Sequence, residues 1–199
     1  MLLLITIIPS LLIVGLFVTF DYFKEPRNEV FKVFFFGLLI TIPAYFLNTY
    51  IGLLFLKLGV TPLLVDSFLS AAWIEEGLKF LILYYIVYKM KEFNEPIDGM
   101  VYGVCASLGF ATLENFYYVY VMSFQDAGPF AIALLRSFSA VPAHGVFGAV
   151  MGYFFMKYSF VKRDNNLILC FVIPFLLHGF YNLLVSLDFR VAMILVIAA

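Results

Sequence analysis

The chain has 199 residues, of which 64% are hydrophobic and 13% charged, and its mean hydropathy is +1.04. This composition is typical of an integral membrane protein and leaves no room for a separate soluble domain, so we expect a single domain over residues 1–199 in contact with membrane lipid. The formal net charge of −1 and the lack of a basic run argue against a nucleic-acid partner. Cys105 and Cys170 fall inside apolar stretches, so we interpret them as packed or lipid-facing thiols and not as a disulfide.

Charged stretches and Pro/Gly turns divide the chain into apolar segments long enough to cross a bilayer. No segment shows the alternation of a membrane β-barrel, so every span should be helical. The first segment lacks the basic start and the cleavage site of a signal peptide, so we expect it to be retained. An all-α, polytopic transmembrane helix bundle of about seven helices is therefore predicted. Its spans are residues 1–20, 30–56, 62–88, 99–122, 130–156 and 167–187, with an apolar tail at 191–199 that is too short to span unless it begins further upstream.

Lysine and arginine are concentrated in alternate loops. Eight of them lie in the first, third and fifth loops, whereas the second, fourth and sixth loops together hold two, Lys57 and Arg190. Basic loops remain in the cytoplasm during membrane insertion. We therefore predict that the N-terminus is outside and that the first, third and fifth loops are cytoplasmic.

Five ionisable side chains lie deep inside the predicted spans: Glu75, Glu76, Glu114, His144 and His178. Measured from the cytoplasmic helix ends, they lie roughly 18–24 Å above the inner boundary of a hydrocarbon core of about 30 Å. A charge in hydrocarbon costs several kcal/mol, so such residues usually pair, bind ions or do chemistry. We therefore predict a single site, to which four helices contribute and which is reached from outside.

The glutamates and His178 each have a polar or aromatic residue nearby on the same helix. Lys79 follows the glutamate pair by four and three residues, so it can supply a cation on the same face. Phe110 and Asn115 accompany Glu114, and Asn182 follows His178 by one turn. Purely structural roles are also possible on the sequence alone. The glutamate pair and Lys79 could form an ion pair that holds the bundle together, and Glu114 and the histidines could be hydrogen-bonded packing residues.

Other residues in the same spans suggest how the helices fit together. Gly148 and Gly152 form a GxxxG surface that another helix can approach closely. Pro142 frees a carbonyl just before His144 and can open the helix locally. We expect Arg136 to snorkel to the interface outside the reactive layer, and Asn48 to form an interhelical hydrogen bond.

Four short motifs carry Glu75, Glu114, His144 and His178. In this order they resemble the motifs of the PrsW family of intramembrane proteases, which is related to the type II CAAX prenyl endopeptidases and to bacteriocin-processing membrane proteases. The resemblance covers about residues 62–187, the motif-bearing core of the domain. CAAX enzymes carry a histidine where this chain has Glu114, which favours the PrsW branch. The matching residues are Glu75-Glu76-x-x-Lys79, Phe110-x-x-x-Glu114-Asn115, the His144 segment and His178-x-x-x-Asn182.

This resemblance implies an intramembrane endopeptidase of the bacterial cell membrane. The PrsW branch is similar to enzymes that make the first, extracytoplasmic (site-1) cut in a single-pass membrane substrate, an anti-sigma factor, and so start a stress response. The predicted depth of the polar layer agrees with this, because it lies nearer the external face.

Two mechanisms for the hydrolysis stay open. The sequence has no HExxH and no serine constellation at the common depth, so a zincin and a serine protease both fit poorly. In one mechanism Glu75 takes a proton from water, Lys79 holds Glu76, His178 and Asn182 stabilise the oxyanion, and Glu114 and His144 complete the site. In the other, Glu114, His144 and His178 hold a metal ion, for which zinc is the best candidate.

A different function is also open on the residues alone. A proton- or cation-coupled membrane transporter would use a midplane Glu/His site as a relay. Against it, the chain shows no inverted repeat, and its polar groups form one layer instead of a path across the membrane. A non-catalytic membrane scaffold would leave the polar layer unexplained.

Overall fold

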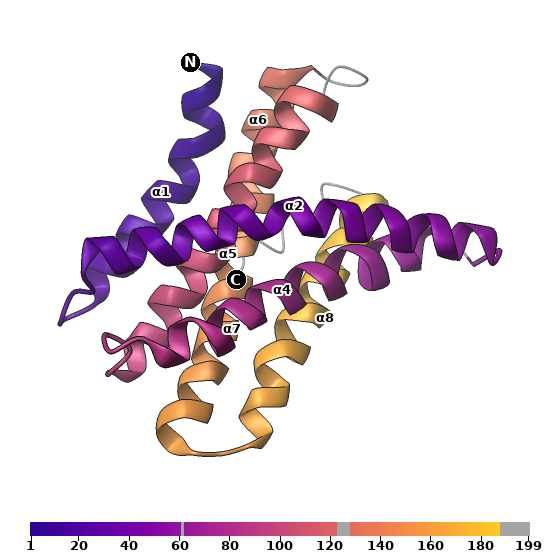
Figure 1. The fold of residues 1–199 in the computed structure, drawn as a ribbon. Coiled ribbons are helices and arrows are strands. Elements are labelled where there is room, and N and C mark those ends of the chain that lie inside the picture. The colour runs from indigo at the N-terminus through magenta and orange to yellow at the C-terminus, as the bar shows by residue number, and fades with distance from the viewer. Residues whose placement is uncertain (61, 123–127, 188–199) are drawn as a thin grey trace.

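The computed structural model describes residues 1–60, 62–122 and 128–187. Within these ranges the chain forms helices and no strand, which confirms the predicted all-α class (Figure 1). The predicted tail at 191–199 and Arg190, which is predicted to be external, lie outside the described residues.

Six helical segments make up the described part of the chain, so the predicted count of about seven is not confirmed. Three segments are single helices: α1 (Leu2–Phe20), α2 (Arg27–Lys57) and α8 (Asn165–Leu187). The other three segments are composite. The first consists of α3 (Pro62–Leu64), the π-helix η1 (Val65–Ala72) and α4 (Trp73–Tyr85), and a 3-10 turn, η2 (Val87–Lys89), follows it. The second consists of α5 (Pro96–Tyr117) and the π-helix η3 (Tyr118–Met122), and the third of α6 (Pro129–Phe138) and α7 (Ala140–Val161).

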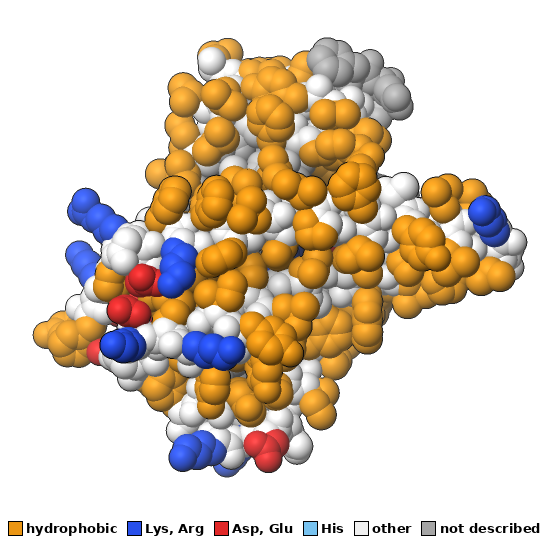
Figure 2. Space-filling view, viewed as in Figure 1, with side chains coloured by type: hydrophobic (Ala, Val, Ile, Leu, Met, Phe, Trp, Pro, Cys, Tyr) orange, Lys and Arg blue, Asp and Glu red, His pale blue; other side chains and the backbone are white. Residues whose placement is uncertain are grey.

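Five of the six segments are long and apolar enough to cross a membrane. The exception is the segment from α3 to α4, which carries the two adjacent glutamates and Lys79. Hydrophobic side chains cover most of the face seen in Figure 2, and charged side chains gather toward its edges. The polar α4 is therefore the element that the apolar helices must shield.

The predicted span 130–156 is broken into two helices. The break falls at Ser139, whose backbone angles (φ −126°, ψ −74°) are not helical. Pro142 consequently lies in the first turn of α7, where a missing N–H leaves no hydrogen bond unmade. The local opening expected at Pro142 occurs three residues earlier, so that His144 lies one turn inside a regular helix.

A contact between α5 and α7 forms the centre of the bundle. Gly99 and Gly103 of α5 face Gly148 and Gly152 of α7, and a Cβ atom at any of the four would collide with the opposite backbone. The close approach predicted for the GxxxG surface is thus confirmed, with two further glycines on the partner helix.

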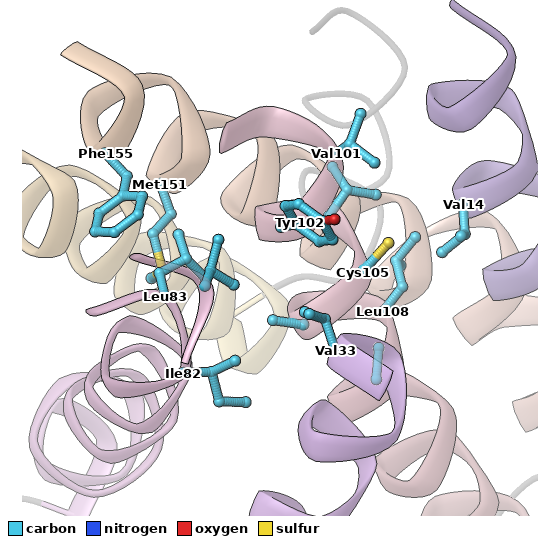
Figure 3. Close-up of a cluster of buried hydrophobic side chains, with 14 of the residues drawn as sticks. Val14, Val33, Ile82, Leu83, Val101, Tyr102, Cys105, Leu108, Met151 and Phe155 are labelled. Carbon is cyan, nitrogen blue, oxygen red and sulfur yellow. The ribbon is translucent and has the colours of Figure 1, made fainter. Parts of the chain in front are cut away.

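A buried apolar cluster surrounds this contact (Figure 3). It contains Tyr102 and Cys105 of α5 and Met151 and Phe155 of α7, with side chains from α1, α2 and α4 packed against them. Cys105 and Cys170 are both buried free thiols, in agreement with the expected absence of a disulfide between them. Close packing of this kind fixes the relative positions of α4, α5, α7 and α8, the helices that carry the predicted site.

Candidate functional site

The five ionisable side chains predicted to share one layer do converge. Glu75 and Glu76 come from α4, Glu114 from α5, His144 from α7 and His178 from α8. Hydrogen bonds and ion pairs of 2.7–3.1 Å connect four of the five, and the fifth, Glu75, lies 3.9 Å from His178. Segments more than 100 residues apart in the chain thus meet at one point of the bundle.

Glu76 is the fixed anion of this cluster. Its Oε1 atom accepts hydrogen bonds from Lys79 Nζ at 2.7 Å and from His178 Nδ1 at 2.8 Å. The side chains of Glu76 and Lys79 are 0% and 1% exposed, so the ion pair has no contact with solvent. The Lys79 ammonium also lies 4.5 Å from the centre of the Phe110 ring. The predicted counter-ion therefore serves Glu76, and Phe110 lies directly against that counter-ion.

The hydrogen bonds of His144 define its protonation. Lys79 Nζ lies 3.0 Å from His144 Nδ1, and an ammonium has only protons to donate, so Nδ1 accepts. The proton of the neutral ring is then on Nε2, which donates to Glu114 Oε2 at 3.1 Å. This tautomer follows from the network of partners. His144 thereby links the cation on α4 to the carboxylate on α5.

His178 presents its other nitrogen toward Glu75. Since Nδ1 donates to Glu76, the neutral ring carries a lone pair on Nε2, which lies 3.9 Å from Glu75 Oε2. In this neutral tautomer Nε2 has no proton to donate to an oxyanion, whereas a protonated ring would have one, so the oxyanion role stays a prediction. A histidine oriented by a carboxylate on its far nitrogen is instead the usual arrangement around a metal ligand.

Glu75 has one oxygen held and one without a partner. Asn48 of α2 donates to Oε1 at 3.1 Å, which is the interhelical hydrogen bond expected of Asn48, whereas Oε2 is buried and accepts no hydrogen bond. One ligand atom each from Glu75, His144 and His178 lies within 4.8 Å of the other two. The structure thus groups Glu75 with the histidines as a set able to hold a metal ion, where the sequence suggested Glu114.

Arg136 does not snorkel away from the site, contrary to the sequence-based expectation. Its Nη2 atom pairs with Glu114 Oε2 at 2.7 Å, its Nε donates to Asn115 Oδ1 at 2.9 Å, and its guanidinium stacks on Tyr118. Asn115 in turn donates to the carbonyl of Thr6 in α1. The break before α7 directs α6 across the site, which brings Arg136 back to Glu114, and a single-span reading of 130–156 could not reveal this.

A cavity of about 470 Å³ gives access to the cluster. Five predicted site residues line it, and the remaining wall comes mainly from η1, α6 and the last turns of α8, with Asn48 of α2 and Tyr118 of η3. η1, α6 and the last turns of α8 belong to the end of the bundle that the charge pattern predicts to be external. The five are Glu75, Glu114, His144, His178 and Asn182.

A second cavity, of about 590 Å³, lies between α2 and the end of α5 with η3. Its walls are mainly apolar and aromatic, with Tyr45, Phe46 and Phe116 among them. The two cavities meet at the cluster, because four residues line both of them: Asn48, Glu75, Glu114 and Tyr118.

Comparison with known proteins places these observations in a family. A sequence model described as PrsW family intramembrane metalloprotease matches residues 25–199. Proteins named Protease PrsW are 37% identical over 164 residues in Geobacillus kaustophilus (81% of this chain, 69% of that protein), 34% over 180 in Clostridioides difficile (88% and 75%), and 35% over 184 in Bacillus subtilis (90% and 80%). No solved structure gives a significant match.

Proposed function

The chain belongs to the PrsW family of intramembrane metalloproteases and is a protease, and from this premise we propose that it makes the first, extracytoplasmic cut in a single-pass membrane substrate of the anti-sigma-factor type. The observation that carries the proposal is the cavity that joins Glu75, Glu114 and the two histidines to the predicted external end. Family membership also argues against the transporter alternative.

The second cavity supports a substrate embedded in the membrane. Its aromatic and apolar walls suit a hydrophobic peptide segment, and its floor includes Glu75 and Glu114. A segment entering between α2 and α5 from the lipid would place its externally exposed end beside the cluster. The first cavity, lined by Asp66, Ser67 and Ser70, would admit the water that hydrolysis consumes.

Glu75 is the carboxylate best placed to act on that water. Each of the two glutamates has one buried oxygen without a hydrogen-bond partner. Glu76 is fully buried and paired with Lys79, whereas Glu75 lines both cavities. We assign Glu75 to proton transfer or to holding the group that activates the water, and Glu76 to orienting His178. Asn182, which lines the first cavity, is the donor that we assign to the developing oxyanion.

The residues present fit the metal ion that the family description implies. The unpartnered Oε2 of Glu75 and the Nε2 lone pair of His178 face the same space, and two histidines with one carboxylate suit zinc. Glu75, His144 and His178 would hold the ion, and His144 would give up one of its present hydrogen bonds. A zinc ion held there would lower the pKa of bound water and polarise the scissile carbonyl.

The test is cleavage by purified protein in liposomes that contain a single-pass substrate. We expect wild-type protein to give one defined fragment, cut on the predicted external side as located by mass spectrometry. Glu75→Gln should reduce the rate by at least about 10²-fold, because a neutral amide neither accepts a proton nor holds a metal well. Glu92→Gln, which lies outside the cavities, is the matched control.

Three outcomes carry information. Wild-type rates in Glu75→Gln would refute the assignment of Glu75. A fragment cut on the opposite side would refute the site-1 role and leave the protease activity intact. Full activity in excess chelator, in a preparation free of metal by elemental analysis, would refute the metal ligands and leave Glu75 as the proton acceptor.

A further inference from the structure

Three more carboxylates meet at the opposite end of the bundle from the cavity. Asp21 and Glu25 lie between α1 and α2, and Asp98 lies in the first turn of α5; Figure 1 shows the connection from α1 to α2 and the start of α5 at the same end of the molecule. One oxygen from each is within 4.8 Å of the other two. The side chains are 2%, 6% and 0% exposed, so water cannot screen their mutual repulsion.

Hydrogen bonds position these carboxylates without neutralising them. Asp21 accepts the backbone N–H groups of Phe23 and Glu25 at 3.2 Å, and Asp98 Oδ2 accepts those of Asn94 and Glu95 at 2.9 and 2.7 Å. The Tyr102 hydroxyl donates to Glu25 Oε2. Within residues 1–60, 62–122 and 128–187, no lysine or arginine forms an ion pair with any of the three.

One oxygen of the cluster is left without a partner. Asp98 Oδ1 is buried and accepts no hydrogen bond. Three carboxylates that shared one proton would still leave two buried negative charges, and an unpaired buried charge is strongly unfavourable. A cation satisfies both the free oxygen and the excess charge.

We propose that Asp21, Glu25 and Asp98 form a second metal site, which binds a divalent ion of the oxygen-preferring class, Mg²⁺ or Mn²⁺. The ligand set is all carboxylate, with no histidine or thiolate, so it differs in chemistry from the cluster of Glu75 and the histidines. The bound ion joins the connection between α1 and α2 to the start of α5. It has a structural role and does not depend on the proposed function.

Binding of Mn²⁺, followed by electron paramagnetic resonance and calorimetry, tests this site. The protein should carry Glu75→Gln so that the other metal-capable cluster does not compete. In this background we expect one Mn²⁺ to bind at neutral pH, to be displaced by excess Mg²⁺, and to raise the unfolding temperature. Asp98→Asn, which keeps an oxygen for the backbone amides, should weaken binding at least about tenfold because affinity follows ligand charge.

Asp21→Asn serves as a second variant in case Asp98→Asn fails to fold, and Glu92→Gln is the control near the same end. We expect Asp21→Asn to weaken Mn²⁺ binding and Glu92→Gln to leave it unchanged. The proposal is overturned if folded Glu75→Gln protein binds no Mn²⁺ at millimolar concentration, which would mean that protons neutralise the cluster. It is equally overturned if the Asp21→Asn protein binds Mn²⁺ as tightly as its parent.

Discussion

The Lys79–Glu76 ion pair offers a quantitative test of how the site is held together. Lys79→Met keeps much of the side-chain volume but removes the charge from a pair that is 1% and 0% exposed. Glu76 would then be a buried carboxylate with His178 as its remaining polar partner. Breaking a buried pair on one side costs about 3–5 kcal/mol, because the other charge is left uncompensated.

The same substitution also removes the donor to His144 Nδ1, which adds the cost of a lost buried hydrogen bond, about 1 kcal/mol or more. We expect Lys79→Met to lower the free energy of unfolding by at least about 3 kcal/mol, measured by denaturation with SDS in mixed micelles. The double variant Glu76→Gln/Lys79→Met should recover much of this loss, since it leaves no unpaired charge.

A surface pair provides the control for this experiment. Lys32 and Glu29 are 3.0 Å apart at the same i,i+3 spacing, but the Lys32 side chain is 46% exposed. Lys32→Met should therefore change the unfolding free energy by less than about 1 kcal/mol. If Lys79→Met were as stable as Lys32→Met, the pair would not be a buried structural element, and the argument that Glu75 alone is free to act would fail.

Three further predictions concern packing, orientation and metal. Gly103→Ala should destabilise the bundle by about 1–3 kcal/mol because the added Cβ meets the α7 backbone. Gly15→Ala, which has open space around it, should change stability by no more than about 1 kcal/mol, and equal effects of the two substitutions would contradict the packing of α5 on α7. Ser186→Cys at the cavity should react with an impermeant thiol reagent added outside intact cells and Arg163→Cys should not, and the reverse pattern would invert the predicted topology. Zinc should copurify with the wild-type protein and be largely lost in His178→Ala; unchanged zinc would remove His178 from the ligand set.

The helices and the members of the candidate site could be predicted from the sequence because both depend on the free-energy cost of placing individual backbone and side-chain groups in lipid. Apolar runs of spanning length must be helical in lipid, and the predicted bounds of α1, α2 and α8 agree with the structure to within a few residues. Glu75, Glu114, His144 and His178 could be found because ionisable groups at that depth are rarely without partners. Their depth along each helix followed from the helical rise alone.

The pairings within the site could not be predicted in the same way. Glu75 and Glu76 are neighbours in the chain, yet a rotation of 100° per residue directs one toward the cavity and the other toward Lys79. Only the packing of α4 on α7 and α8 decides which is which. The pairing of Arg136 with Glu114 likewise depends on the helix break at Ser139, for which the sequence offers Pro142 three residues later as its nearest sign.

The glycine contact between α5 and α7 has a consequence for how a substrate can enter. Backbones that touch directly have no side chain between them that could change rotamer, so these two helices must move as one rigid body, carrying Glu114 and His144 together. The same kind of contact joins α2 to α5, because a Cβ atom at Gly37 or Gly109 would collide with the opposite backbone. If the site must widen to admit a peptide, the helices left to move are α4 and α8. This motion would separate Lys79 from His144 Nδ1 and free that nitrogen for another partner. Substrate entry and the hydrogen bonding of His144 are therefore mechanically coupled.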